Sequence, residues 1–200
     1  MLFNSYIFIF VFLPLTLGSY YGLHKLGKPV FAKITLILMS FWFYGYFNPN
    51  YLWIMCSSII VNYLLSQLLQ RKWEMSAAQI AVLKKSLLAI GLIFNLGLIF
   101  YFKYYDFFVD NLNKVFSTDF QLKNIVLPLG ISFFTFQQVS YMVDSYRGET
   151  KEYNFADYAL FVTFFPQLIA GPIVLHNEVL PQFEDKNNWK INWDNIAHGL

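Results

Sequence analysis

The chain has 200 residues, of which 57% are hydrophobic, 21% aromatic and only 13% charged, with a formal net charge of +2. Soluble domains usually carry about a quarter charged residues, so this composition argues against an ordinary soluble domain and favours a protein that sits in lipid. The small net charge and the lack of a Lys/Arg-rich block argue against nucleic-acid binding, and a single cysteine rules out an intrachain disulfide.

The first apolar run is predicted to be a retained membrane helix. Residues 1–23 contain no charge, whereas a signal peptide begins with a basic region and ends in small residues. Here the basic residues Lys25 and Lys28 follow the run instead. We therefore place a first span near 2–22, because about 20 apolar residues cross the hydrocarbon core.

The next uncharged stretch is long enough for two spans. Residues 34–70 carry no charge, and Asn48-Pro49-Asn50 in the middle is a strong turn signal. These features predict spans near 31–47 and 51–69, joined by a very short loop.

Three further apolar stretches follow, near 86–102, 125–143 and 158–177. The last one is interrupted by Pro166 and Pro172, which remove backbone donors. Broken backbone at membrane depth is tolerated where protein or a cavity supplies partners. The pattern predicts a kinked or re-entrant helix, which either borders a binding site or is a simple proline kink.

The distribution of Lys and Arg predicts the orientation of the chain. Nine of these residues fall in the predicted loops 24–33, 70–85 and 144–157, and three fall in the alternate loops 48–50 and 103–124. This bias predicts that the amino terminus lies outside the membrane.

The stretch 103–123 mixes apolar and charged residues and has two interpretations. Phe108, Leu112, Val115 and Phe116 recur at helical spacing. The stretch is either a short amphipathic helix on the outer surface or an ordinary loop.

The predicted fifth span is unusually polar for a segment in lipid. On a helix, four of its polar residues fall within an arc about 100° wide: Gln137, Ser140, Tyr141 and Asp144. Val139, Met142 and Val143 lie on the opposite side of the helix. Because unpartnered polar groups are costly in hydrocarbon, this arc must face protein or water. It either joins helices by hydrogen bonds or lines a cavity for a polar ligand.

The sequence contains no spacing that indicates nucleophilic catalysis or a metal site. Its histidines are His24, His176 and His198. His24 is expected in a solvated basic loop, and His176, which follows the broken helix, is either an interfacial or a site residue. From the residues alone, the chain is a polytopic, all-α transmembrane bundle with a polar seam.

Two stretches carry a resemblance to a known family. "LPLGISFFTFQQVSYMVDSYRGE" followed by "FFPQLIAGPIV" resembles the membrane-bound O-acyltransferases, in particular the branch of the alginate O-acetylation membrane protein. The opening "MLFNSYIFIFVFLPLTLGSYY" and the turn "FYGYFNPNYLWIM" resemble that branch as well. The resemblance extends over nearly the whole chain.

The resemblance implies an enzyme of the bacterial inner membrane that moves an acyl group, usually acetyl, onto hydroxyls of an exported polysaccharide. The donor would be a thioester, acetyl-CoA or an acyl carrier, acting as substrate with no bound cofactor or metal. The expected partners are membrane lipid and extracytoplasmic acetyltransferase proteins. Residues of this chain would line the tunnel in which donor and acceptor meet, and by motif position the candidates are Gln137, Gln138, Tyr141, Asp144, Gln167 and Gly171.

One departure from the family pattern concerns catalysis. The family's histidine, proposed as general base, stands in a Trp-His-Gly context that does not occur here; His198 follows Ala197. We therefore expect residues 1–200 to be the N-terminal transmembrane portion of a larger domain, with this histidine beyond residue 200 and no activity of the portion alone. The alternative function is a non-enzymatic membrane transporter or scaffold subunit.

Overall fold

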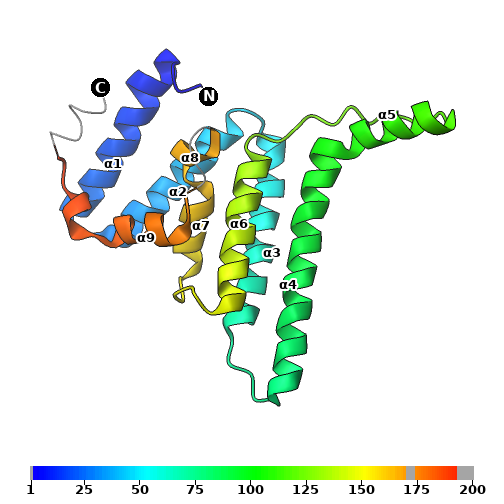
Figure 1. Ribbon diagram of the computed structural model, residues 1–200. Coiled ribbons are helices and arrows are strands. Elements are labelled where there is room, and N and C mark those ends of the chain that lie inside the picture. The colour runs from blue at the N-terminus through cyan, green and yellow to red at the C-terminus, as the bar shows by residue number, and fades with distance from the viewer. Residues whose placement is uncertain (1, 170–173, 193–200) are drawn as a thin grey trace. The chain divides into compact units, whose positions relative to one another are not determined.

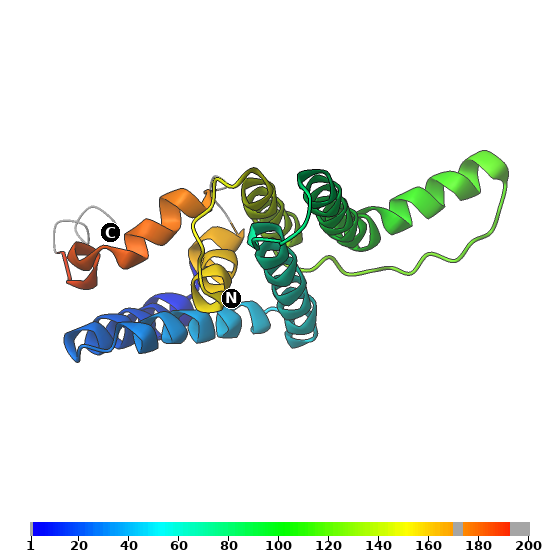
Figure 2. The same ribbon diagram turned by 90° about the horizontal axis from the view of Figure 1, so that it is seen from below.

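The computed structural model describes residues 2–169 and 174–192. All regular elements in these ranges are helices, in agreement with the predicted all-α fold class. The chain divides into two compact units (Figures 1 and 2). Unit 1 comprises Met1–Leu52 and Lys151–Leu200, and unit 2 comprises Trp53–Thr150.

Unit 1 begins with two antiparallel helical segments. The π-helix η1 (Phe8–Phe12) runs into α1 (Leu13–Lys25), which packs against α2 (Pro29–Gly45). Gly27 adopts φ 71° in the turn between α1 and α2, a conformation that favours glycine. Aromatic side chains fill the space between the helices, and the buried cluster comprises Phe8, Phe12, Met39, Phe43 and Phe165.

The second half of unit 1 contains the predicted broken helix. It is built from α7 (Phe155–Thr163), α8 (Phe165–Ile169), α9 (His176–Glu184) and the 3-10 helix η4 (Lys186–Trp189). The helices α7 and α8 both pack on α2, and α9 packs on α7. The chain leaves helical geometry at Phe164, where ψ is 107°. The interruption that Pro166 and Pro172 predicted is thus present at Phe164, and Pro172 lies outside the described residues.

The predicted turn between the second and third spans is also present. Asn48 accepts a hydrogen bond from the backbone N–H of Asn50 at 3.0 Å and starts the 3-10 helix η2 (Pro49–Tyr51). The turn ends at Leu52, where α3 begins.

Unit 2 is formed by three long helices that lie alongside one another in Figures 1 and 2: α3 (Leu52–Gln70), α4 (Ala77–Ile99) and α6 (Ile131–Arg147). A Cβ built on Gly91 of α4 would lie 2.5 Å from Met142 Cε of α6 and 3.3 Å from Leu65 Cδ1 of α3. The three helices therefore meet closely at Gly91.

Two helices, α4 and α6, begin well away from the starts of their predicted spans. α4 begins at Ala77, before the span predicted near 86–102, because Ser76 and Gln79 form a capping box there. α6 begins at Ile131, later than the span predicted near 125–143. Asp106 holds the preceding segment in a non-helical conformation by accepting hydrogen bonds from the backbone N–H groups of Lys123 (2.8 Å) and Ile125 (2.9 Å).

The ambiguous stretch 103–123 is helical as far as Phe116 and non-helical after it. The π-helix η3 (Phe100–Tyr104) continues α4 into α5 (Tyr105–Phe116). Val109 is buried, whereas Phe107 and Phe108 are exposed. The position of α5 on the outer membrane surface remains a prediction.

Within the described residues, two helical stretches are long and apolar enough to cross a membrane. They are Pro49–Gln70 and Ala77–Phe116, and Pro29–Gly45 is a shorter apolar helix. This arrangement agrees with a polytopic helical membrane protein.

Candidate functional site

The first candidate region is the polar face of α6 in unit 2. Gln138 is fully buried and donates a hydrogen bond from Nε2 to Ser58 Oγ of α3 at 3.0 Å. Gln137 is buried as well, and Asp144 is half-buried near the end of the helix. The contact of Gln138 is of the kind that joins helices in membranes.

At the other end of α6, Gln70 of α3 connects two residues of the seam. Its Nε2 donates to Ser145 Oγ at 2.9 Å and lies 3.5 Å from the hydroxyl of Tyr141. Ser145 in turn donates to the backbone carbonyl of Tyr141 at 2.8 Å. The fully buried Tyr141 is therefore part of a polar network between α3 and α6.

The side of α6 opposite the polar residues is partly buried and partly exposed. Met142, which the helical arc placed opposite the polar residues, is fully buried and packs against Gly91. Phe136, by contrast, is exposed. Because α6 is surrounded on two sides, its polar residues face protein whether or not a tunnel is present, and their tunnel role remains a prediction.

A buried amide pair between α3 and α4 was missed by the sequence reasoning. Asn95 donates to Asn62 Oδ1 at 2.6 Å, and Asn62 donates to Asn95 Oδ1 at 3.2 Å. Both side chains are fully buried. The available signal was a single Asn within each apolar run, since a lone amide in lipid requires a partner.

The second candidate region is a cavity of about 650 Å³ in unit 1, which we call the broken-helix cavity. It lies between α1, the α7–α8 break and the α9–η4 segment. Gln167, one of the residues predicted to line the substrate tunnel, lines this cavity. Gly171, the other candidate in this stretch, lies outside the described residues.

The helix break is stabilised by a side chain of α2. Pro166 stands in the first turn of α8, where its missing N–H costs no hydrogen bond. The backbone N–H of Phe165 donates to Ser40 Oγ at 3.3 Å. A protein partner therefore replaces the hydrogen bond that the interruption removes, as expected for broken backbone at membrane depth.

The lining of the broken-helix cavity is rich in uncharged hydrogen-bonding groups. Among the described residues that line it, Lys190 alone is charged. The polar remainder consists of amides and hydroxyls: Thr16, Tyr20, Tyr21, Gln167, Gln182, Asn187, Asn188 and Asn192. Such groups can bind and orient a polar ligand, because amides and hydroxyls offer both donors and acceptors.

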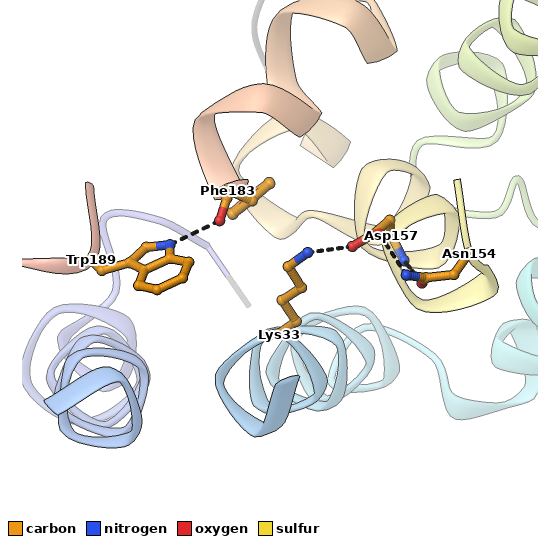
Figure 3. A network of polar contacts seen from close by, with 5 residues as sticks. All are labelled: Lys33, Asn154, Asp157, Phe183 and Trp189. Atoms are coloured by element: carbon orange, nitrogen blue, oxygen red, sulfur yellow. Dashed lines mark hydrogen bonds and ion pairs between the residues drawn. The ribbon is translucent and has the colours of Figure 1, made fainter. Parts of the chain in front are cut away.

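An ion pair joins α2 to α7 beside a smaller cavity of about 410 Å³. Lys33 Nζ lies 2.6 Å from Asp157 Oδ1, and Asn154 donates to Asp157 Oδ2 at 2.7 Å (Figure 3). Asn154 also caps α7 by accepting from the backbone N–H of Asp157 at 2.9 Å. Lys33 therefore has a structural partner 124 residues away in the sequence.

The two histidines that lie within the described residues, His176 and His24, both contact aromatic rings. His176 is 3% exposed and meets Tyr153 and Phe161 edge-on, with ring centroids 6.1 and 6.2 Å away. His24, expected to be solvated, is half-buried and stacks on Trp189 at 4.7 Å. His198 lies outside the described residues. No group of three or more His, Cys, Asp or Glu within residues 2–169 and 174–192 could hold a metal ion.

The helices and these sites define a polytopic helical membrane protein with a broken helix beside a polar cavity. Residues 111–196 match the model of the membrane-bound O-acyltransferase family. The chain is 41% identical over 226 aligned positions to the peptidoglycan O-acetyltransferase of Helicobacter pylori. The alignment covers 100% of this chain and 42% of that protein.

Alginate-related proteins are similar over the same region. The probable alginate O-acetylase of Pseudomonas aeruginosa is 34% identical, with 94% of this chain and 35% of that protein covered. Its counterpart in Azotobacter vinelandii is 34% identical, with 100% of this chain and 38% of that protein covered. The chain belongs to the membrane-bound O-acyltransferase family and spans about two fifths of the length of these relatives. No solved structure matches it.

Proposed function

We propose that the protein carrying this chain transfers an acetyl group from a thioester donor to a hydroxyl of an extracytoplasmic polysaccharide in a bacterial inner membrane. The observation that carries this proposal is the similarity across the whole chain to a peptidoglycan O-acetyltransferase. Peptidoglycan is the preferred acceptor over alginate, because the identity to the first relative is higher, 41% against 34%.

In the proposed reaction a histidine base, expected beyond residue 200, takes the proton of the acceptor hydroxyl while the oxygen attacks the thioester carbonyl. The new ester bond forms, the carbon–sulfur bond breaks, and the donor leaves as a thiol after it takes up the proton. Acetyl-CoA and an acyl carrier are both suitable donors. Residues 1–200 alone are then expected to be inactive.

This chain would contribute binding and orientation. Gln167 stands at the broken helix, where a ligand in the broken-helix cavity can reach its amide. Gln137, Gln138, Tyr141 and Asp144 would line the family's tunnel from α6. With the amino terminus outside, as the Lys/Arg bias predicts, donor and acceptor would approach from opposite sides, and an extracytoplasmic partner would handle the acetylated product.

The test is expression of the complete natural protein in bacteria that lack their own O-acetyltransferase. Mild base should release ester-linked acetate from purified peptidoglycan, measured by mass spectrometry, and more from peptidoglycan than from supplied alginate. Acetate on neither polymer, with the protein inserted in the membrane, would favour the transporter or scaffold instead.

A matched pair of variants addresses the role of the cavity. Gln167→Leu should lower transfer at least about tenfold, the typical cost of a lost orienting contact of about 1.4 kcal/mol. Gln121→Leu, at an exposed position of the extended segment, should leave transfer unchanged. Equal activity of both variants would remove Gln167 from the proposed site.

A further inference from the structure

Unit 1 contains another cavity, of about 790 Å³, between the end of α1 and η4, which we call the basic pocket. Apart from the titratable His24, its charged lining residues are Lys25, Lys186 and Lys190, and none of the described residues that line it is Asp or Glu. All three lysines are exposed. The pocket therefore presents a concentration of positive charge at the end of an apolar helix.

These lysines have no acidic partner in the part of the chain that the structure describes. The ion pairs there involve Lys33, Lys114 and Arg147 instead. Like charges gathered around one cavity repel one another, and an anion between them would relieve this repulsion. The charge of the pocket is thus complementary to a phosphate or another anion.

The floor of the basic pocket is an open groove along α1. Gly18 and Gly22 lie one turn apart, and a Cβ built on either residue meets nothing within 4 Å. Leu17 and Tyr21 flank the two glycines in the lining. An apolar chain can lie directly against the backbone of α1 at this point.

Aromatic groups form the wall between the charged end and the apolar floor. Trp189 is held in place by its indole N–H, which donates to the backbone carbonyl of Phe183 at 3.0 Å (Figure 3). His24 stacks on this indole, and its burial, with Lys33 nearby, lowers the pKa of His24. The wall is therefore neutral near pH 7, and the three lysines supply the charge.

We propose that the basic pocket binds an anionic phospholipid, with its phosphate against Lys25, Lys186 and Lys190 and one acyl chain in the groove over Gly18 and Gly22. Basic pockets beside membrane helices recognise anionic headgroups in this way, and a Trp at the boundary suits the headgroup level. A soluble anion would use the lysines but would leave the apolar floor empty. This inference is independent of the acetyl-transfer proposal.

The experiment uses the complete natural protein in nanodiscs that contain a photoreactive phosphatidylglycerol in a phosphatidylcholine background. Labelling should map by peptide mass spectrometry to residues 17–25 and 186–191, and unlabelled phosphatidylglycerol should compete. Lys186→Gln with Lys190→Gln should reduce labelling by about fivefold per lysine, the usual contribution of one cation near an anionic surface. Lys186→Arg with Lys190→Arg should retain it, which separates loss of charge from misfolding.

Two controls complete the design. Lys84→Gln with Lys85→Gln removes the same charge from α4, outside the pocket, and should leave the labelling unchanged. Gly18→Phe should block the groove, whereas Gly18→Ala should be tolerated because no atom lies near the added methyl group. Equal labelling in the two Lys→Gln pairs, or labelling outside the pocket, would overturn the proposal. Competition by inorganic phosphate or by a CoA thioester, but not by phosphatidylglycerol, would also overturn it.

Discussion

Several buried polar side chains of unit 2 bond to neighbouring helices, whereas many polar side chains of unit 1 line cavities. In unit 2, Gln138 bonds to Ser58, and Asn62 pairs with Asn95. In unit 1, Gln167 and Lys190 line the broken-helix cavity. The described residues that line the three cavities all belong to unit 1.

Polar side chains therefore have two different roles in this apolar chain. Polar groups that bond across a helix interface stabilise the packing and leave little capacity for a ligand. Polar groups on a cavity wall are accessible to a ligand. A broken helix can supply such groups because some of its backbone N–H and C=O groups lack partners within the helix. We therefore expect changes at Gly91 and at the Asn62–Asn95 pair of unit 2 to act mainly on stability, and changes at the unit 1 cavities to act mainly on ligands. The α6 residues proposed for the tunnel are a separate case.

The largest stability effect is expected at Gly91, where α3, α4 and α6 meet. Gly91→Leu would overlap Met142, which is fully buried and cannot move into solvent. Overpacking of this kind costs about 1–3 kcal/mol, and the absence of free space places this site near the upper end. The free energy of unfolding in detergent, measured by denaturant titration, should fall accordingly.

Gly97→Leu is the matched control on the same helix. A Cβ at Gly97 meets nothing within 4 Å, and replacing a helical glycine gains up to about 1 kcal/mol. The control should therefore be neutral or stabilising. A similar loss in both variants would contradict the close approach of the three helices at Gly91.

A smaller effect is expected in unit 1 when the ion pair between α2 and α7 is broken. Asp157→Ala leaves Lys33 without its carboxylate, at a site where the two side chains are 20% and 9% exposed. We expect a loss of about 2 kcal/mol, between the values for exposed and for buried pairs. Hydrogen exchange should speed up in α2 and α7 and stay unchanged in α3, α4 and α6.

The combined change Lys33→Met with Asp157→Leu tests whether the lost energy comes from an unpaired charge. Apolar residues of similar size often replace a buried pair without loss, so slow exchange in α2 and α7 should return. Fast exchange in the combined variant would show that the hydrogen bonds of Asn154 and Asp157 at the start of α7 contribute more than the charges.

The fold class could be predicted because it depends on local pattern. Uncharged runs, the Asn48-Pro49-Asn50 turn and Pro166 each act within one element, and the structure contains all three features. The starts of α4 and α6 could not be placed by hydropathy. The first depends on the capping box at Ser76, and the second on Asp106, which bonds to backbone groups 17 and 19 residues away.

The candidate site was harder to predict because its partners are distant in sequence. Tyr141 and Gln137 of the predicted polar arc are both buried. The partners of Tyr141 and Gln138 on α3, however, have no signature in the sequence of α6. Gln70 and Tyr141 are 71 residues apart, and Gln138 and Ser58 are 80 apart. The broken-helix cavity likewise combines α1 with residues 164–192, and only their packing in unit 1 brings these segments together.

The smallest effect is expected for the amide pair between α3 and α4. Asn62→Leu or Asn95→Leu removes one partner of a bond measured at 2.6 Å and leaves the other amide buried, and each should cost about 1 kcal/mol. The double variant should cost less than the two single variants together, because it leaves no orphaned amide. The coupling energy from unfolding of all four proteins in detergent should be about 0.6–2 kcal/mol. Strict additivity would mean that each amide is satisfied by its own helix, through the carbonyls of Ser58 and Gly91 that already accept from them.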